Sequence, residues 1–504
     1  MRDNKIKYYA SALFLIIALM AFLTTGRAQK SEGDHSRNIP KTFDDEALAT
    51  MDVPLANPAF SPVHGKSELY YSLRLRPLYK TYTVYAPGKE PPGYMDWLKQ
   101  QEPELIPFDV SKLKTEEDWI KAGEIIFDAA VTINRHSSVD EVRSPAFYEK
   151  TGLPVAKDGS IPFYRYVVTK KGEVSLGEFS CGMCHTRVMS DGSIIKGAQG
   201  NFPFDRIMAF GYRARYKVEW ARNVTLILSD TPWLDPNPHA RLKEMSLDEI
   251  ASAHEAIPPG AVTRFGSSVF FPPQVPDLIG LKDRHYFDHT GLVRHRTIGD
   301  LMRYSAIVQG ADVLDQFGQF RPLGRAPDPA TLERYSDEQL YALGLYLYSL
   351  KPPPNPNKFD SLAERGQKVF EREGCGGCHT PPLYTSNKLT PVDGFRVPED
   401  HLKKFDILPV SVGTDPNLAL NTRRGTGYYK VPSLKGVWYR GPFEHNGSVA
   451  SLEDWFDPRR TKSDYVPTGF RGFGVKTRAV KGHLFGLDLS AEDRKALIAF
   501  LKTL

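Results

Sequence analysis

The pattern of apolar residues along the chain predicts four amphipathic helices, arranged as two similar pairs. One helix of each pair lies upstream of a short cysteine-containing motif, beginning near Thr115 and near Phe359. The second helices span 336–350 and 490–504, and each begins at a serine, a favoured N-cap. Because apolar residues recur every three or four positions, each helix has one face to bury. These positions are Trp119, Ala122, Ile126 and Phe127; Leu362, Val369 and Phe370; Leu340, Leu343, Leu347 and Leu350; Leu497, Phe500, Leu501 and Leu504.

The first half of the chain carries an insertion that the second half lacks. Gly123 and Phe127 have the same spacing as Gly366 and Phe370, so the two upstream helices correspond. The second phenylalanine stands only five positions before its motif, whereas the first stands fifty-four positions before its own. The end of the insertion, 164–169 and 173–179 around a Lys-Lys-Gly turn, alternates as a β-hairpin does.

A second stretch of the repeat lies downstream of each motif. The sequence Val-Pro-Asp-Leu-Ile-Gly at 275–280 corresponds to Val-Pro-Ser-Leu-Lys-Gly at 431–436, and the match continues in register to Gly291 and Gly447. Between the two copies, the proline-rich segment 351–358 predicts a stiff linker. We therefore expect a mainly α fold with two related domains, 111–350 and 359–504, the first with loop and hairpin insertions, and a segment 29–110 that wraps the first domain.

The N-terminus and the composition restrict the setting in which the protein works. Basic residues precede an apolar run at 10–23 that ends in a small-x-small pattern, so 1–28 is expected to be an export signal, or an anchor if uncleaved. The run is short for a membrane span, and no later segment is long enough. Lysine and arginine are dispersed among nearly as many acids, for a net charge of +5, which gives nucleic-acid binding little support. The periplasm is the expected compartment.

All four cysteines belong to two copies of one motif. These are Cys181-Gly182-Met183-Cys184-His185 and Cys375-Gly376-Gly377-Cys378-His379. In c-type haem attachment, the two thiols bond covalently to the porphyrin and the following histidine binds the iron. A zinc or thiol-redox site is the alternative, but export to an oxidising compartment disfavours it. The sequence therefore predicts two covalently bound haem c groups, ligated by His185 and His379.

These motifs and the segments around them resemble the bacterial di-haem cytochrome c peroxidase superfamily, which includes the methylamine-dehydrogenase-maturing enzymes and the rubber oxygenases. The resemblance covers roughly 115–504 and is strongest at 431–434 and 443–447. It implies that one haem relays electrons while the other, with an open or labile sixth position, performs the chemistry. The tryptophan that the peroxidase branch has between its haems is missing here, and Trp220, Trp233 and Tyr286 are the candidate replacements.

His483 is the residue that we expect to close the second haem. No methionine follows Met302, so the usual methionine ligand is absent from the second domain. Glycines on both sides of His483 allow close approach of the chain to the porphyrin, and a similar stretch occurs in the rubber-oxygenase-like branch. His401, His445 and Tyr465 are the alternatives, and His445 has a repeat partner in His289, which favours a structural role.

The first haem, by contrast, is expected to be open. The position equivalent to His483 is occupied by Pro329, and 316–330 contains neither histidine nor methionine. Gln199 and Arg206, in the glycine-containing segment after the first motif, are the candidate distal residues beside the catalytic iron on His185. A sixth ligand from elsewhere in the first half would close this site. The residues available for that are His136, His239, His254, His285, His295, Met208 and Met245.

The expected function is that of a periplasmic oxidoreductase of the peroxidase type, which reduces hydrogen peroxide or activates dioxygen at the first haem. A small soluble redox protein, a cytochrome c or a cupredoxin, would donate electrons through the second haem. A non-enzymatic di-haem electron carrier is the first alternative. A haem dioxygenase acting on an apolar substrate is the second, suggested by the aromatic and proline-rich stretch 270–273. The sequence leaves open whether a calcium ion lies between the domains.

Overall fold

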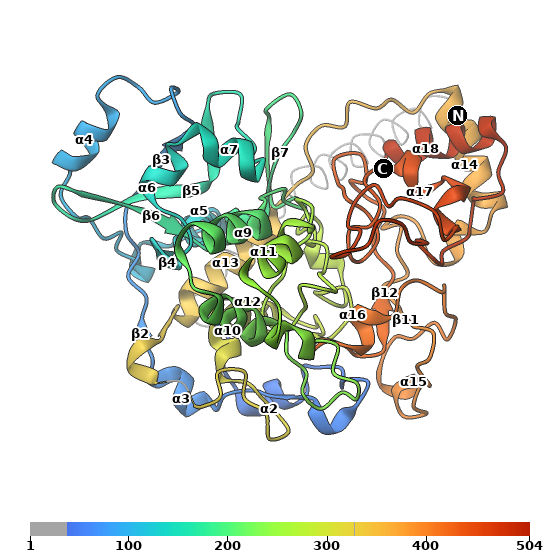
Figure 1. The fold of residues 1–504 in the computed structure, drawn as a ribbon, viewed down its shortest axis with the longest axis horizontal. Helices are drawn as coiled ribbons and strands as arrows, with labels where there is room; N and C mark the ends of the chain where they lie inside the picture. Colours follow the sequence, from blue (N-terminus) through green and yellow to red (C-terminus); the bar gives the residue numbers. More distant parts are fainter. Residues whose placement is uncertain (1–37, 327) are drawn as a thin grey trace, which may run out of the picture.

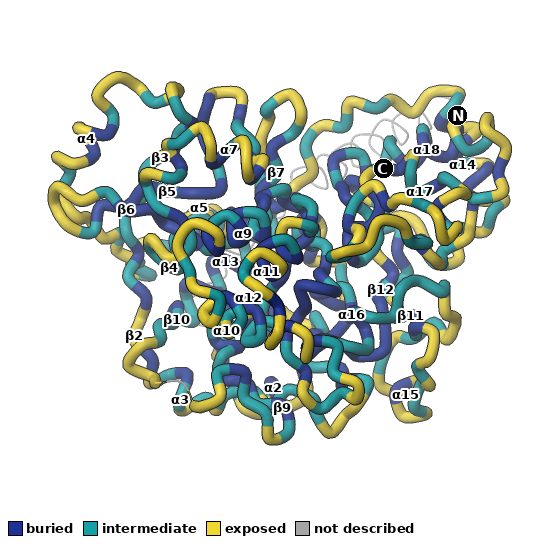
Figure 2. The backbone as a smooth tube through the Cα atoms, in the orientation of Figure 1, coloured by how far each residue is buried: buried dark blue, intermediate teal, exposed yellow. Residues whose placement is uncertain are grey.

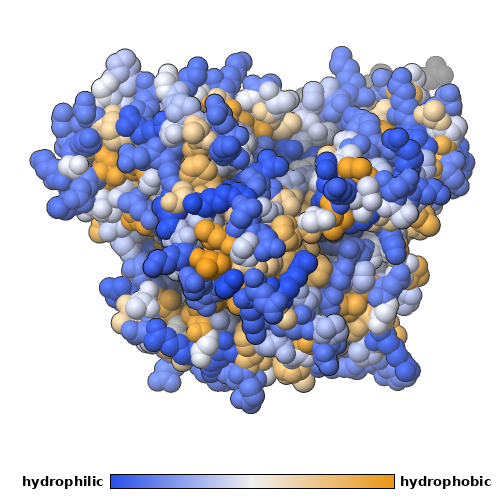
Figure 3. Space-filling view, viewed as in Figure 1, coloured by the Kyte–Doolittle hydropathy of each residue, from blue (hydrophilic) through white to orange (hydrophobic). Residues whose placement is uncertain are grey.

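The computed structural model describes residues 38–326 and 328–504. The expected export signal at 1–28 lies outside the described residues. Helices dominate, and the two halves of the chain lie side by side, with residues 359–504 forming the orange and red side of Figure 1. Figure 2 shows buried segments running through the centre of both halves, and Figure 3 shows a largely hydrophilic face. Within the described residues, no helix combines the length and the apolar character needed to cross a bilayer.

The helix pair of the first half is α5 (Glu116–Asp128) and α13 (Asp337–Ser349). Thr115 and Ser336 are the N-caps, each within a capping box that satisfies the first free backbone amides. The two helices cross at Gly123, where an added Cβ would lie 2.0 Å from the carbonyl oxygen of Ala342. A side chain at this crossing would therefore force the helices apart.

The second half builds the same crossing from α14 (Ser361–Arg372) and α18 (Ala491–Lys502). A Cβ on Gly366 would lie 1.9 Å from the carbonyl oxygen of Ala496, and Ser490 caps α18 as expected. The N-cap of α14 is Asp360, so this helix begins just after the phenylalanine from which the apolar pattern starts. The shared glycine spacing in the sequence thus corresponds to a shared way of packing two helices.

The remaining elements are mostly short. The predicted hairpin is present as β5 (Ser160–Lys170) and β6 (Glu173–Glu178), in a four-stranded sheet of order β3-β5-β6-β4. The other helices of the first half are α2 (Asp45–Ala49), α3 (Ser67–Ser72), α4 (Tyr94–Gln100), α6 (Val139–Val142), α7 (Pro145–Thr151), α8 (Cys181–Cys184), α9 (Phe204–Arg215), α10 (Val218–Ser229), α11 (Leu247–Glu255) and α12 (Ile298–Val308). Those of the second half are α15 (His401–Lys404), α16 (Asn417–Leu420) and α17 (Leu452–Trp455). The other strands are β1 (Pro62–Val63), β2 (Arg74–Leu75), β3 (Thr81–Tyr85), β4 (Thr132–Ile133), β7 (Thr186–Val188), β8 (Ile194–Lys196), β9 (Gln316–Phe317), β10 (Glu333–Arg334), β11 (Leu389–Pro391) and β12 (Tyr428–Lys430).

The segment before α5 packs onto the first helix pair. Phe43, Met51 and Tyr70 are buried in one apolar cluster with residues of α5, α12 and α13. Strand β3 adds an edge to the sheet by pairing with β5. Residues 38–110 therefore cover the first half rather than forming a core of their own.

The two halves meet through a pair of matching backbone hydrogen bonds. The amide of Gln274 donates to the carbonyl of His445 at 2.7 Å, and the amide of Lys430 donates to the carbonyl of His289 at 2.9 Å. Gln274 and Lys430 hold the same position in the repeated sequence, as do His289 and His445. The two copies thus exchange equivalent contacts, as the subunits of a twofold-symmetric dimer do. We call this contact region, where 274–296 meets 383–440, the seam.

Candidate functional site

The first cysteine motif forms one short helical turn at the end of the hairpin. Ser180 caps α8, so that Cys181 and Cys184 lie one turn apart and His185 follows directly. The ring of His185 is fixed through Nδ1, which lies 3.0 Å from the carbonyl oxygen of Pro276. A histidine that donates from Nδ1 to a carbonyl keeps Nε2 free for a metal. This arrangement fits an iron ligand.

The second motif repeats this arrangement. Cys375 begins the 3-10 turn η8 (Cys375–Gly377), and Nδ1 of His379 lies 3.1 Å from the carbonyl oxygen of Pro432. Pro432 is the repeat partner of the proline that holds the first histidine. Nδ1 also lies 3.2 Å from the carbonyl oxygen of Tyr384. Both motifs therefore present a histidine whose orientation the backbone fixes.

His483 lies opposite His379. The two ring centroids are 6.3 Å apart, and the rings are inclined at 56°. Because a metal–imidazole nitrogen bond is about 2 Å long, two rings at this spacing could both bind one metal ion held between them. Nδ1 of His483 is buried without a hydrogen-bond partner. The spacing and the unpaired nitrogen fit a second iron ligand at this site.

The backbone around His483 is held in a strained conformation by Arg460. His483 itself has a φ of 44°, and a Cβ on Gly482, at φ 74°, would lie 2.3 Å from the backbone of Gly413. The buried guanidinium of Arg460 donates to the carbonyls of Val480, Gly482 and His483 at 2.8–3.0 Å. A left-handed non-glycine residue fixed this firmly is a feature typical of functional sites.

The alternative ligands for the second haem lie in other contacts. His401 makes a 3.0 Å hydrogen bond to the hydroxyl of Tyr428, and His445 is paired with Glu444 at 2.6 Å and stacks on Tyr429. The Tyr465 hydroxyl is buried without a partner. Of these residues, His483 is the one whose ring faces His379 at the spacing of a shared metal.

His185 has no such partner ring. Within residues 38–326 and 328–504, no histidine ring stacks opposite it as His483 does opposite His379. A cluster of polar side chains lies nearby instead. Burial lowers the pKa of His185 to about 4, and the charge of Arg264 adds to that effect. Arg264 Nη1 donates to the hydroxyl of Tyr304 at 3.1 Å, and so does the buried Arg424, at 3.3 Å. The first motif therefore borders a cationic, hydrogen-bonding environment.

Asp312 is the acidic member of this cluster. It lies in the 3-10 turn η6 (Ala311–Leu314) just after α12, and Gln309 at the end of that helix donates to the sulfur of Cys181 at 2.9 Å. The Asp312 side chain is buried, and among the described residues it forms no hydrogen bond or ion pair. Burial, with the charge of the neighbouring Asp315, raises its pKa to about 7, and the charge of Arg264 opposes the shift. Asp312 is thus a carboxyl that can exchange a proton near neutral pH.

Gln199 and Arg206 are placed differently from this cluster. Gln199 is 1% exposed, and its amide donates to the carbonyl of Pro442 at 3.0 Å while its oxygen accepts from the amide of Gly441. These bonds join the two halves of the chain. Arg206 lies half-buried on α9, near Gly152. The distal role suggested for both residues stays a prediction.

The other candidate ligands of the first half are mostly engaged elsewhere. His136 is the exception, because its buried Nδ1 has no partner and its ring lies against two phenylalanines. Met208 and Met245 lie in an apolar cluster around α9 and α11. The remaining pairs are His239 with Thr231 and Ser268, His254 with Asp205 and Thr225, His285 with Asp406, and His295 with Tyr348.

A buried lysine occupies the seam between the two motifs. Nζ of Lys430 donates to the carbonyls of Tyr286 and Phe287, at 3.2 and 2.8 Å. Burial, the largest cause, lowers its pKa to about 7. Of the three candidate replacements for the missing tryptophan, Tyr286 is the one that lines this seam.

Among the described residues no three His, Cys, Asp or Glu side chains cluster as a metal site would require, so calcium stays a prediction.

Sequence comparison identifies relatives of the chain. The cytochrome-c peroxidase IdrP1 of Denitromonas iodatirespirans is 26% identical over 163 residues, which are 28% of this chain and 40% of that protein. The methylamine utilization protein MauG of Methylorubrum extorquens is 28% identical over 143 residues, 28% of this chain and 34% of that protein. The chain is thus similar to members of the di-haem cytochrome c peroxidase and MauG superfamily. Each alignment covers less than half of the length of the protein that it matches. No family model matches the chain.

Solved structures align with the chain at low similarity. A MauG-like protein associated with microbial copper homeostasis aligns with a TM-score of 0.30 and 16% identity, over 58% of this chain and 88% of that one. A hydrazine synthase chain of Kuenenia stuttgartiensis aligns with a TM-score of 0.31 and 16% identity, over 59% and 92%.

Proposed function

We propose that the protein is an exported di-haem oxidoreductase of the peroxidase type, with an open catalytic haem on His185 and a closed electron-relaying haem on His379 and His483. The difference between the two histidine environments carries this proposal. His379 faces a second imidazole at 6.3 Å, whereas His185 feels the charge of Arg264, which in turn contacts Tyr304 and acts on the ionisable carboxyl of Asp312. When bound, haem c supplies a redox-active iron that takes up electrons and binds small oxidants where a position is open.

The residues near His185 suit reduction of hydrogen peroxide. Cleavage of the O–O bond needs a group that moves a proton from one oxygen to the other and a donor that stabilises the departing oxygen. The Asp312 carboxyl, with its pKa near 7, can accept the first proton and return it to the leaving oxygen. The guanidinium of Arg264 and the hydroxyl of Tyr304 supply positive charge and hydrogen bonds. Two electrons and two further protons then complete the conversion of peroxide to two waters.

The seam suits electron transfer between the two sites. The carbonyls that hold His185 and His379 belong to Pro276 and Pro432, and both prolines lie in the seam. The two prolines line one inner cavity, together with Tyr286 and Lys430. The buried ammonium of Lys430 favours an additional electron in its vicinity. In this proposal the protein works in the periplasm, and a small soluble cytochrome c or cupredoxin donates the electrons. Dioxygen is the alternative oxidant.

The test is rapid mixing of the purified holoprotein with hydrogen peroxide, followed by optical spectroscopy at the haem bands. We expect a fast spectral change that depends on peroxide concentration, is lost in His185→Ala and is retained in His401→Ala. Carbon monoxide should bind one haem of the fully reduced protein. If the protein reacts with neither peroxide nor carbon monoxide, both haems are closed, and the protein is an electron carrier instead.

A further inference from the structure

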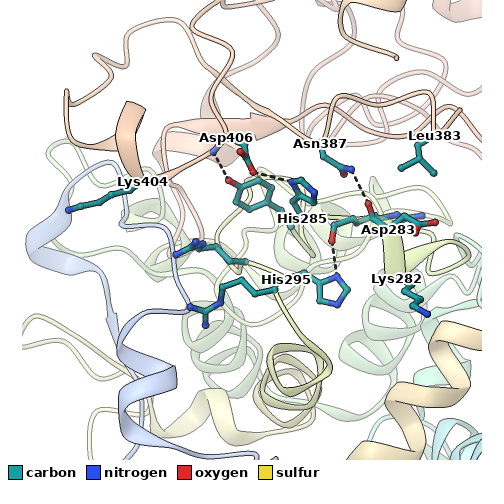
Figure 4. A pocket seen from close by; sticks show the side chains of 12 residues that line it. Lys282, Asp283, His285, His295, Leu383, Asn387, Lys404 and Asp406 are labelled. Atoms are coloured by element: carbon teal, nitrogen blue, oxygen red, sulfur yellow. Dashed lines mark hydrogen bonds and ion pairs between the residues drawn. The ribbon is translucent and has the colours of Figure 1, made fainter. Parts of the chain in front are cut away.

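A basic depression opens on the surface at the seam. It has a volume of about 570 Å³ and lies where 282–296 meets 383–406. Figure 4 shows its lining, in which His285 of the first half is bonded to Asp406 of the second, and Asn387 is bonded to Asp283. The depression therefore exists only because the two halves of the chain meet.

The lining carries an excess of positive charge. Its five cationic side chains face two carboxylates, Asp283 and Asp406. Arg296 and Lys404 are neutralised by acids just outside the lining. The guanidinium of Arg284 donates to the carbonyls of Asp277 and Ile279, and the carboxylates of Asp277 and Asp283 offset its charge. Within the described residues, Lys282 and Arg294 form no ion pair with a carboxylate. Uncompensated cations around one opening attract an anionic partner.

The depression also lies next to the backbone that holds both haem-ligating histidines. It shares Arg284, Tyr286 and Asn387 with the small inner cavity of the seam. The walls of that inner cavity include Pro276 and Pro432, whose carbonyls accept from His185 and His379. A partner bound in the depression would therefore be separated by one inner cavity from the carbonyls that hold both histidines.

We infer that this depression docks a small acidic electron-transfer protein, which delivers electrons to the proposed haem pair through the seam. This inference rests on the proposed function and adds to it the place of docking and the charge of the donor. In each encounter the reduced donor loses one electron to the haem held by His379, and two encounters supply the two electrons that one peroxide consumes. The carboxylates around the donor's redox centre would face Lys282 and Arg294. A basic donor would be repelled from the same surface.

The test measures the rate of electron transfer from a reduced donor protein to the ferric holoprotein, in the absence of peroxide. A reduced acidic cupredoxin and a reduced basic cytochrome c are each mixed with the ferric holoprotein in a stopped-flow instrument, at ionic strengths of about 10 and about 300 mM, where the Debye length falls from roughly 30 Å to below 8 Å. We expect the acidic donor to react at least tenfold faster at the lower ionic strength. The basic donor should be slower, and its rate should rise with salt.

Charge-reversal variants locate the surface. Lys282→Glu and the double variant Lys282→Glu/Arg294→Gln should each lower the rate with the acidic donor at low salt, the double variant by about tenfold or more, and the loss should disappear at high salt. Lys150→Glu on α7 and Lys217→Glu before α10 remove exposed lysines elsewhere and should leave the rate within about twofold. Lys282 is exposed, so its replacement leaves the fold intact.

Either of two results overturns the inference: rates with the acidic donor that do not depend on salt, or an equal loss in the control variants. Failure of the proposed function gives a different result. If the wild type, supplied with a small uncharged reductant, does not consume peroxide, the peroxidase proposal fails, while the rates of electron entry still decide the docking site.

Discussion

Replacing Asp312 by asparagine tests the proposed proton transfer most sharply. The change keeps the shape of the side chain and removes its ability to take a proton. The carboxyl is buried beside Asp315 without a hydrogen-bond partner among the described residues, and its pKa is raised to about 7. Because the proton acceptor is the ionised form, the rate of peroxide reduction should be highest above pH 7 and should fall as the pH drops through 7.

The size of the effect follows from this pKa. At pH 7 about half of the carboxyls are ionised, and at pH 5 only about one in a hundred, so the wild-type rate should fall roughly tenfold per pH unit below 6. Asp312→Asn should lose about 10²- to 10⁴-fold at pH 8 and show no inflection near pH 7. The matched control is Asp464→Asn, which changes an exposed carboxylate.

The assay is the second-order rate of the peroxide-induced spectral change between pH 5 and 9, with each variant checked for full haem content. A wild-type profile that is flat across pH 7, or an Asp312→Asn variant that retains the wild-type rate and the inflection, would refute the assignment.

Three further predictions concern the second haem, the seam and the helix crossing. His483→Ala should convert the second haem from low-spin to high-spin and allow it to bind carbon monoxide, whereas His401→Ala should leave both spectra unchanged. Lys430→Met removes a buried ammonium that is charged below its pKa of about 7, so it should lower the midpoint potentials of both haems in a redox titration at pH 6, whereas Lys435→Met at an exposed position should not. Gly366→Ala should lower the free energy of unfolding by about 1–3 kcal/mol or more in chemical denaturation, because a Cβ there collides with a carbonyl of α18.

Much of the fold could be predicted from local patterns. The helix starts at Thr115, Ser336 and Ser490 follow from capping chemistry, because a hydroxyl that satisfies free amides is a local requirement. The repeat alone predicted which glycines correspond, and the structure places Gly123 and Gly366 at matching helix crossings. The assignment of the repeats to two haem domains stays a prediction supported by this symmetry.

Some residues of the candidate site could be predicted from the sequence, and others could not. His483 could be proposed because the two copies of the repeat differ at this position. The first copy has Pro329 there, which has no side-chain donor for a metal. Asp312 could not be proposed, since nothing in the local sequence distinguishes a buried aspartate from an exposed one. Its raised pKa depends on burial and on the charges of Arg264, Arg424 and Asp315, which the chain brings together only on folding. Gln199 makes contacts that the local sequence does not predict: its amide joins the two halves of the chain, and its suggested place beside the haem stays a prediction.

The central claim is that the two haem sites differ, one open and one closed by a second histidine. The most direct measurement is the electron paramagnetic resonance spectrum of the ferric holoprotein at low temperature. We predict one high-spin and one low-spin signal in equal amounts, with the low-spin signal lost in His483→Ala. Two low-spin signals, or a low-spin signal that survives in His483→Ala, would contradict the account.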